Sequence, residues 1–168
     1  MTTVLRFLVL QVLLLWQGGF LFYTAVVVPT GTKLLGAAGQ GVITARVTDA
    51  LNAIGAVALG ALALELRLTR DPNSRRTVYR WWAWGVALAC HGLLIYFHML
   101  LDAFMDDERR RVLVAAPFYP VHRMYLWAST VQWVACALLA WWTQRAWKAE
   151  DGGFAAENAE RDKSGKKN

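Results

Sequence analysis

Four long apolar runs dominate this sequence and restrict what the chain can fold into. They span residues 4–28, 43–68, 78–101 and 121–147 of a chain of 168 residues. Each run reaches the ~20 residues that a helix needs to cross the hydrocarbon core of a bilayer. We therefore predict an all-α fold, a four-helix transmembrane bundle in residues 1–148, with both termini on the same side of the membrane.

Composition and charge support a lipid environment. Hydrophobic residues make up 57% of the chain, more than an ordinary soluble domain contains. The formal net charge is +6, but the basic residues lie in short loops and in the tail. There they are typical of topology signals, so we expect a lipid bilayer and no nucleic acid as partner. The Gly-, Glu- and Lys-rich tail, residues 149–168, is predicted to be disordered.

The connecting segments and small residues indicate how the spans are arranged. A Gly-rich segment at 29–41 and an Asp-Pro-Asn-Ser sequence at 71–74 are predicted turns. In the second span, small residues recur at helical spacing, which favours close packing against another helix. They are Ala53, Ala56, Gly60 and Ala63. Lys and Arg are slightly more numerous beside the termini than on the opposite side, which predicts cytoplasmic termini.

Most ionisable residues of the spans gather where span two begins, span three ends and span four begins. Alternating topology brings these three helix ends to one membrane surface, predicted to be the outer one. The resulting polar layer contains Arg46, Asp49, Asn52, His98, Asp102, His122, Arg123 and Tyr125. Ionisable groups in a membrane need a partner or a water-lined cavity, so this layer is the candidate site. Three interpretations of it remain open.

The first interpretation is a structural latch. Arg46 or Arg123 would pair with Asp49 or Asp102, and the histidines would bond to hydroxyl groups nearby. Contacts of this kind hold membrane helices together at about 0.6–2 kcal/mol each. The layer would then have no ligand.

The second interpretation is a divalent metal site. His98 and Asp102 are one helical turn apart, and His122 and Asp49 would complete the ligand set. Nitrogen and oxygen donors without thiolate suit zinc or copper. Haem is disfavoured, because His122 starts its span at the wrong depth to face His91.

The third interpretation is a polar pocket for a small molecule, a lipid head group or a proton path. Its ligand-binding residues would be Arg46, Asp49, Asn52, Arg123 and Tyr125, and His98 and His122 could exchange protons. The two arginines could grip an anionic group as bidentate donors. A transport route through so thin a bundle would require a homo-oligomer or another membrane protein as partner.

An enzymatic function is not favoured, because no nucleophile–base pair stands out. Ser129 and Thr130 share a span with His122, but Ser129 has no GxSxG elbow around it. The leading hypothesis is a non-enzymatic membrane protein that binds a metal ion or small polar ligand in the polar layer. The alternative is a structural or accessory subunit that docks other membrane helices.

Several short elements resemble a known family. The stretch from Trp16 to Pro29 contains a W-x-G-G-x-x-F sequence, and Val121-His122-Arg123 opens the last span. These elements are similar to those of bacterial membrane proteins of unknown function related to eukaryotic transmembrane protein 205, in which Leu usually stands at the position of Val121. The resemblance implies a four-span protein of the bacterial inner membrane without an assigned reaction. The pair His98 and Asp102 has no counterpart in the family pattern.

Overall fold

The computed structural model describes residues 3–106, 111–112 and 115–165. The elements are helix α1 (Thr3–Phe22), a π-helical turn η1 (Tyr23–Val27), α2 (Val28–Leu68), α3 (Ser74–Ala103), strands β1 (Met105–Asp106) and β2 (Arg111–Val112), and α4 (Ala115–Gly165). Three helical stretches, 3–68, 74–103 and 116–155, are long and apolar enough to cross a membrane. The prediction of an all-α protein is confirmed, apart from the two-residue antiparallel strands.

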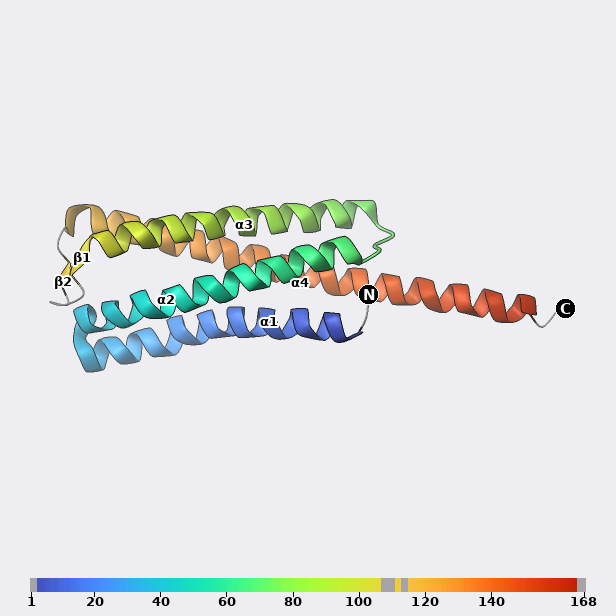
Figure 1. The fold of residues 1–168 in the computed structure, drawn as a ribbon, viewed down its shortest axis with the longest axis horizontal. Coiled ribbons are helices and arrows are strands. Elements are labelled where there is room, and N and C mark those ends of the chain that lie inside the picture. Colours follow the sequence, from blue (N-terminus) through green and yellow to red (C-terminus); the bar gives the residue numbers. More distant parts are fainter. Residues whose placement is uncertain (1–2, 107–110, 113–114, 166–168) are drawn as a thin grey trace.

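The first helical stretch folds back on itself at Gly36. This residue has φ 73° and ψ 167° inside α2, a conformation that only glycine adopts without strain. The residues before it form one arm and those after it a second, antiparallel arm (Figure 1). The predicted turn over 29–41 is therefore much tighter than expected.

A widened helical turn explains why the first arm does not end at Pro29. Proline removes one backbone donor and crowds the carbonyl four residues earlier, which normally ends or kinks a helix. Here η1 ends two residues before Pro29, and the N–H of Val28 donates to the carbonyl of Tyr23, five residues back. The π-helical turn gives the proline ring room, so the helix continues to the glycine hinge.

The two arms, α3 and the first part of α4 lie side by side (Figure 1). The N-terminus lies at the end where the loop of residues 69–73 joins α2 to α3 and where α4 leaves the bundle. We call this the terminal end. The opposite end carries the Gly36 hinge and the β1–β2 pair, and we call it the hinge end.

Small side chains let the core helices approach closely. Trp16 of α1 lies against Gly55 of α2, where an added Cβ would come within 2.8 Å of the indole ring. The core is formed by Val9, Leu13, Trp16, Ala58, Leu59, Leu62, Leu66, Ala83, Ala87, Ala135, Cys136 and Leu139. The small residues predicted to pack against another helix lie on a different face of α2 from Gly55, because Ala53, Ala56 and Gly60 are exposed.

Helix α4 also continues further than expected. It extends to Gly165, so residues 149–165 are helical where we expected a disordered tail; residues 166–168 lie outside the described part. Arg6 of α1 pairs with both Glu150 and Asp151 at 2.7 Å, and these contacts anchor α4 to α1 where α4 leaves the bundle. The Ala- and Glu-rich sequence that follows favours helix once it is started.

Candidate functional site

The predicted polar layer at the hinge end brings three of its residues together. His98 Nε2 lies 2.7 Å from Asp49 Oδ1 across the α2–α3 interface, and 3.5 Å from Asp102 Oδ2 on its own helix. The histidine side chain is 11% exposed, whereas the aspartates are 58% and 52% exposed. One imidazole nitrogen therefore faces two carboxylates that remain open to the outside.

His122 does not join this group. Its ring stacks on Phe118, one turn earlier on α4, with a centroid separation of 5.9 Å and nearly parallel planes. Across the residues described, no three His, Cys, Asp or Glu side chains are grouped so that they could hold a metal ion. The four ligands predicted for zinc or copper thus do not converge, because the His122 side chain lies along its own helix.

The remaining residues of the predicted ligand pocket differ in exposure. Arg46 and Arg123 are exposed, and Asn52 is half-buried. Tyr125 is half-buried and hydrogen-bonds with Thr48, which links α4 to α2.

A neighbouring polar contact fixes the hinge. Tyr23 donates a hydrogen bond to Thr44 Oγ1 at 2.9 Å and accepts one from Gln40 Nε2 at 3.0 Å. Thr44 in turn donates to the Gln40 carbonyl. These bonds join the π-helical turn to the second arm of α2 across the reversal.

A second interhelical contact lies at mid-bundle. Gln132 of α4 donates to the Ala87 carbonyl of α3 at 3.2 Å, and its Nε2 also lies 3.1 Å from His91 Nδ1. The edge of Trp16 packs against the same imidazole. The other ring nitrogen of His91, Nε2, is buried and has no hydrogen-bond partner among the residues described. His91 therefore connects α1, α3 and α4.

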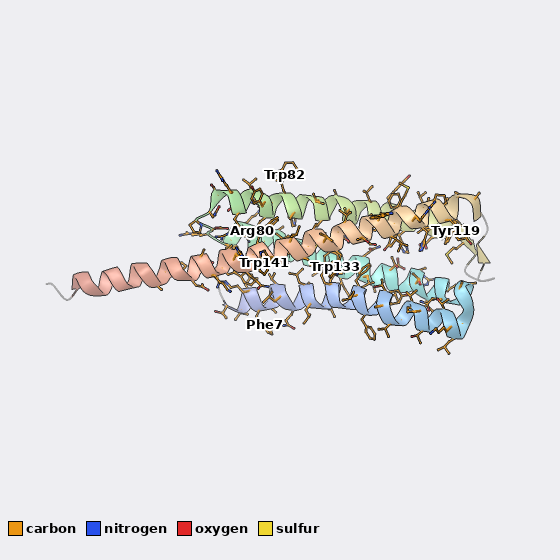
Figure 2. The ribbon with its side chains drawn as sticks, turned by 180° about the vertical axis from the view of Figure 1, so that it is seen from behind. Phe7, Arg80, Trp82, Tyr119, Trp133 and Trp141 are labelled. Atoms are coloured by element: carbon orange, nitrogen blue, oxygen red, sulfur yellow. The ribbon has the colours of Figure 1, made fainter. Side chains whose placement is uncertain are left out.

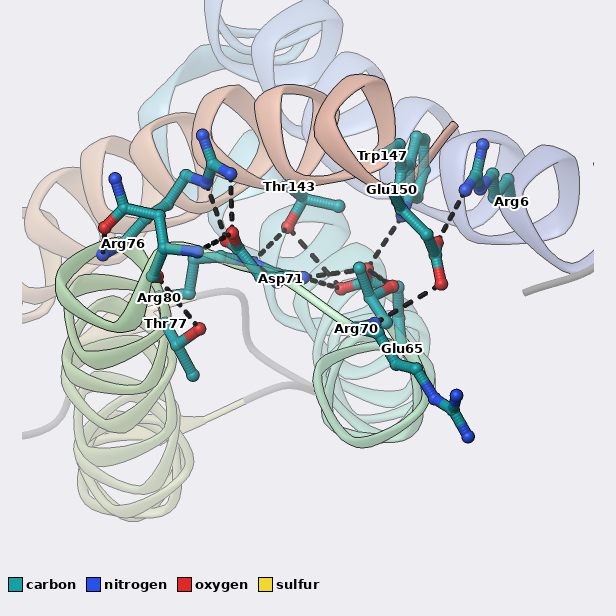
Figure 3. A network of polar contacts seen from close by, with 12 residues as sticks. Arg6, Glu65, Arg70, Asp71, Arg76, Thr77, Arg80, Thr143, Trp147 and Glu150 are labelled. Atoms are coloured by element: carbon teal, nitrogen blue, oxygen red, sulfur yellow. Dashed lines mark hydrogen bonds and ion pairs between the residues drawn. The ribbon is translucent and has the colours of Figure 1, made fainter. Parts of the chain in front are cut away.

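The most deeply buried charges lie at the terminal end. Glu65 of α2 is fully buried, and Arg80 of α3 is 1% exposed. Arg80 Nη2 lies 2.7 Å and 2.6 Å from the two carboxylate oxygens of Glu65. Figure 3 shows this pair with Thr143 and Trp147 of α4 beside it.

Neutral donors complete the environment of the Glu65 carboxylate. Trp147 Nε1 donates at 2.8 Å, and Thr69 Oγ1 donates at 2.6 Å. Thr143 of α4 lies between the two charges, because it accepts from Arg80 Nε at 3.3 Å and donates to Glu65 at 3.5 Å. We call Glu65, Thr69, Arg80, Thr143 and Trp147 the ionic clamp, since together they tie α2, α3 and α4.

Further ionic contacts adjoin the clamp in the loop of residues 69–73. Asp71 accepts two bonds from Arg76, at 2.6 Å and 2.5 Å, and its Oδ2 lies 4.0 Å from Arg80 Nη1. Burial by itself would raise the pKa of Asp71. The bonds from Arg76 and from the Asn73 N–H, with the charges of Arg76 and Arg80, outweigh that effect and leave the pKa below its ordinary value.

Comparison with known proteins gives no relative. The chain matches no family model, no curated protein and no solved structure. The resemblance to the transmembrane protein 205 group therefore stays a prediction. Function has to be argued from the geometry of the chain itself.

Sequence reasoning missed the clamp, although the sequence contains a signal for it. Glu65 is the one carboxylate in the apolar run 53–68, and Arg80 looked like one more loop arginine. Both residues lie only a few positions from the turn at 69–73, on the two helices that it joins. On antiparallel helices, residues at similar distances from a short turn meet at the same depth, so a carboxylate and an arginine placed in this way predict a pair.

Proposed function

We propose that this chain is a non-catalytic integral membrane protein that acts as a structural or accessory subunit. In this proposal it crosses the bilayer four times, with the two arms of the first helical stretch as separate spans and both termini in the cytoplasm. The observation that carries the proposal is the ionic clamp, in which deeply buried charged groups contact neighbouring helices.

The energetics of charge in hydrocarbon support a structural role for these groups. An Arg or Asp at the centre of a membrane helix costs about 2.5–3.5 kcal/mol on insertion scales, so such residues pair with one another inside bundles. Glu65 and Arg80 form such a pair, and the polar side chains of Gln132 and His91 contact each other. Interhelical contact is thus sufficient to account for these polar side chains.

The outer surface supports a lipid environment. Large apolar side chains are exposed along every helix, and water-soluble monomers rarely expose such continuous patches. They include Phe7, Leu14, Phe22, Leu64, Trp82, Met99, Trp127 and Trp141. Contact with lipid tails or with other membrane helices would remove the cost of exposing them to water.

The outward small-residue face of α2 supports docking to another helix. Ala53, Ala56 and Gly60 are exposed, and a Cβ at Gly60 would meet no other atom within 4 Å. Small residues on the outside of a membrane helix let a partner backbone approach closely. An accessory subunit would use such a face.

Two measurements test the proposal. The tagged chain, expressed at low level, should stay in the pellet when membranes are extracted with alkaline carbonate. A stoichiometric membrane-protein partner should co-purify in mild detergent and should be retained in Asp49→Asn and His98→Ala. Release by carbonate would refute membrane insertion, and purification without any partner would refute the accessory role.

A second candidate function is binding of a small polar ligand at the hinge end. It is favoured by one observation: Asp49 and Asp102 share a single imidazole nitrogen and are each more than half exposed. Mass spectrometry of the purified protein would then find a co-purifying small polar molecule that is lost in His98→Ala and Asp49→Asn. An Arg123→Gln variant should lose it as well if the ligand is anionic.

A further inference from the structure

An apolar groove runs along the outside of the bundle between α3 and α4. Its walls include Tyr79, Trp82 and Val86 of α3 and Val134, Leu138 and Trp142 of α4, and its volume is about 400 Å³. That volume lies within the roughly 300–1,000 Å³ of small-molecule sites. Trp82 stands on the outer side of α3 (Figure 2).

The lining of the groove suits hydrocarbon. One of its few hydroxyl groups belongs to Thr130, which donates to the Leu126 carbonyl of its own helix at 2.9 Å. The other wall atoms are almost entirely carbon, and Val86, Val134 and Leu138 are each at least 40% exposed. A bound group would bury this apolar surface and find almost no polar partner along the groove.

The two ends of the groove differ in charge. Arg75 lies one turn before Tyr79 on α3, and Arg145 lies one turn after Trp142 on α4. At 100° per residue both arginines fall on the groove side of their helices, and both are exposed. Among the residues that the structure describes, neither pairs with a carboxylate; the Arg145 guanidinium lies over the Trp141 ring. The other end continues into apolar residues such as Leu93 and Leu126.

The length of the groove matches one leaflet of a bilayer. From Thr130 to Trp142 the α4 wall rises about 18 Å at 1.5 Å per residue. Half of a ~30 Å hydrocarbon core is about 15 Å. The aromatic rings of Tyr79, Trp82 and Trp142 lie toward the basic end, where Trp and Tyr are enriched at membrane interfaces.

We propose that this groove binds one acyl chain of an anionic phospholipid, with its phosphate held by Arg75 and Arg145. The inference rests on the proposed membrane insertion. A single basic end joined to an apolar channel of leaflet length fits an amphiphile with one anionic head. Arginine suits the head because its planar guanidinium can donate two parallel hydrogen bonds to phosphate oxygens. The bound lipid belongs to the leaflet beside the termini.

Native mass spectrometry of the full chain in detergent tests the proposal. The protein is titrated with dioleoyl phosphatidylglycerol and, separately, with dioleoyl phosphatidylcholine. We expect phosphatidylglycerol to bind at least tenfold more tightly, and each of Arg75→Gln and Arg145→Gln to weaken it about fivefold, as for one basic residue near an anionic surface. Val134→Trp, which fills the groove from a half-exposed position, should weaken both lipids.

Arg67→Gln is the matched control, because Arg67 is an exposed arginine at the terminal end on α2, away from the groove. It should leave the affinity for phosphatidylglycerol unchanged. Equal affinity for the two lipids, or an equal loss in Arg67→Gln, would overturn the proposal. A dimer that is dissociated by Val134→Trp would overturn it too, since a second copy would then occupy the groove. Carbonate extraction distinguishes failure of the lipid site from failure of membrane insertion. A protein that stays in the membrane but shows no lipid preference refutes the lipid site alone.

Discussion

Removing the Glu65 charge of the ionic clamp alone should be more damaging than removing both charges. Glu65→Gln keeps the shape of the side chain and an oxygen that can accept the hydrogen bond from Trp147. It removes the carboxylate that pairs with Arg80. Arginine cannot lose its proton in a protein, so the charge stays buried. Removing one partner of a buried ion pair costs about 3–5 kcal/mol, and we expect Glu65→Gln to lie in this range.

Arg80→Met should be less damaging than Glu65→Gln. The carboxylate left behind keeps its hydrogen bonds from Thr69 and Trp147. We expect a cost of about 1–3 kcal/mol, the usual value for loss of buried polar partners. The double variant Glu65→Gln/Arg80→Met buries no charge, so it should be more stable than Glu65→Gln alone.

Unfolding in mixed micelles with increasing sodium dodecyl sulfate, followed by tryptophan fluorescence, measures these free energies. Arg75→Met is the matched control, since it makes the same change at an exposed position of α3 and should alter stability by less than about 0.5 kcal/mol. The reasoning is refuted if the double variant loses the sum of the two single losses. It is also refuted if Glu65→Gln costs under about 1 kcal/mol, the value of a solvent-exposed pair.

Three further predictions concern packing, backbone and pH. Gly55→Ala should destabilise the protein by about 1–3 kcal/mol because its Cβ would lie 2.8 Å from the Trp16 ring, whereas Gly60→Ala should be neutral or slightly stabilising in the same micelle titration. Gly36→Ala should cost about 1–2 kcal/mol because φ is +73° there, and a thermal melt that is unchanged would contradict the hinge. The folded-state pKa of Asp71 lies below its ordinary value of 3.8, so its stabilising effect is complete above that value and is lost as pH falls through the folded-state pKa. The stability difference between the protein and Asp71→Asn should therefore be constant near neutral pH and shrink below about pH 4; a difference that grows on acidification would refute it.

The length of the apolar runs was sufficient to predict an all-α protein, and the alternating direction of the helices was sufficient to place His98 near Asp49. These features depend on position along the chain, which the sequence states directly. The failures concern rotation about a helix axis. His122 was assigned to the His98 group by depth, but its ring lies against Phe118. The small residues Ala53 and Gly60 were predicted to pack against another helix, but spacing did not show that they face outward while Gly55 is the residue that meets Trp16.

The sequence also did not predict the local backbone geometry of the first reversal. Pro29 and the glycines after it indicated a long turn, because proline usually ends a helix. The π-helical turn at Tyr23–Val27 removes that conflict, and the reversal is concentrated at Gly36. Such a compensation depends on one backbone hydrogen bond, which composition does not reveal.

In the proposed topology the chain crosses the membrane four times, with the hinge end outside and both termini in the cytoplasm. Single cysteines at Leu34, Ser74 and Gly153, in a background where the buried Cys90 and Cys136 are replaced by alanine, test this topology by labelling intact cells with a membrane-impermeant maleimide. Leu34→Cys at the hinge end should label from outside, while Ser74→Cys and Gly153→Cys should label only after the membrane is opened. Labelling of Leu34→Cys and Ser74→Cys from the same side would contradict it.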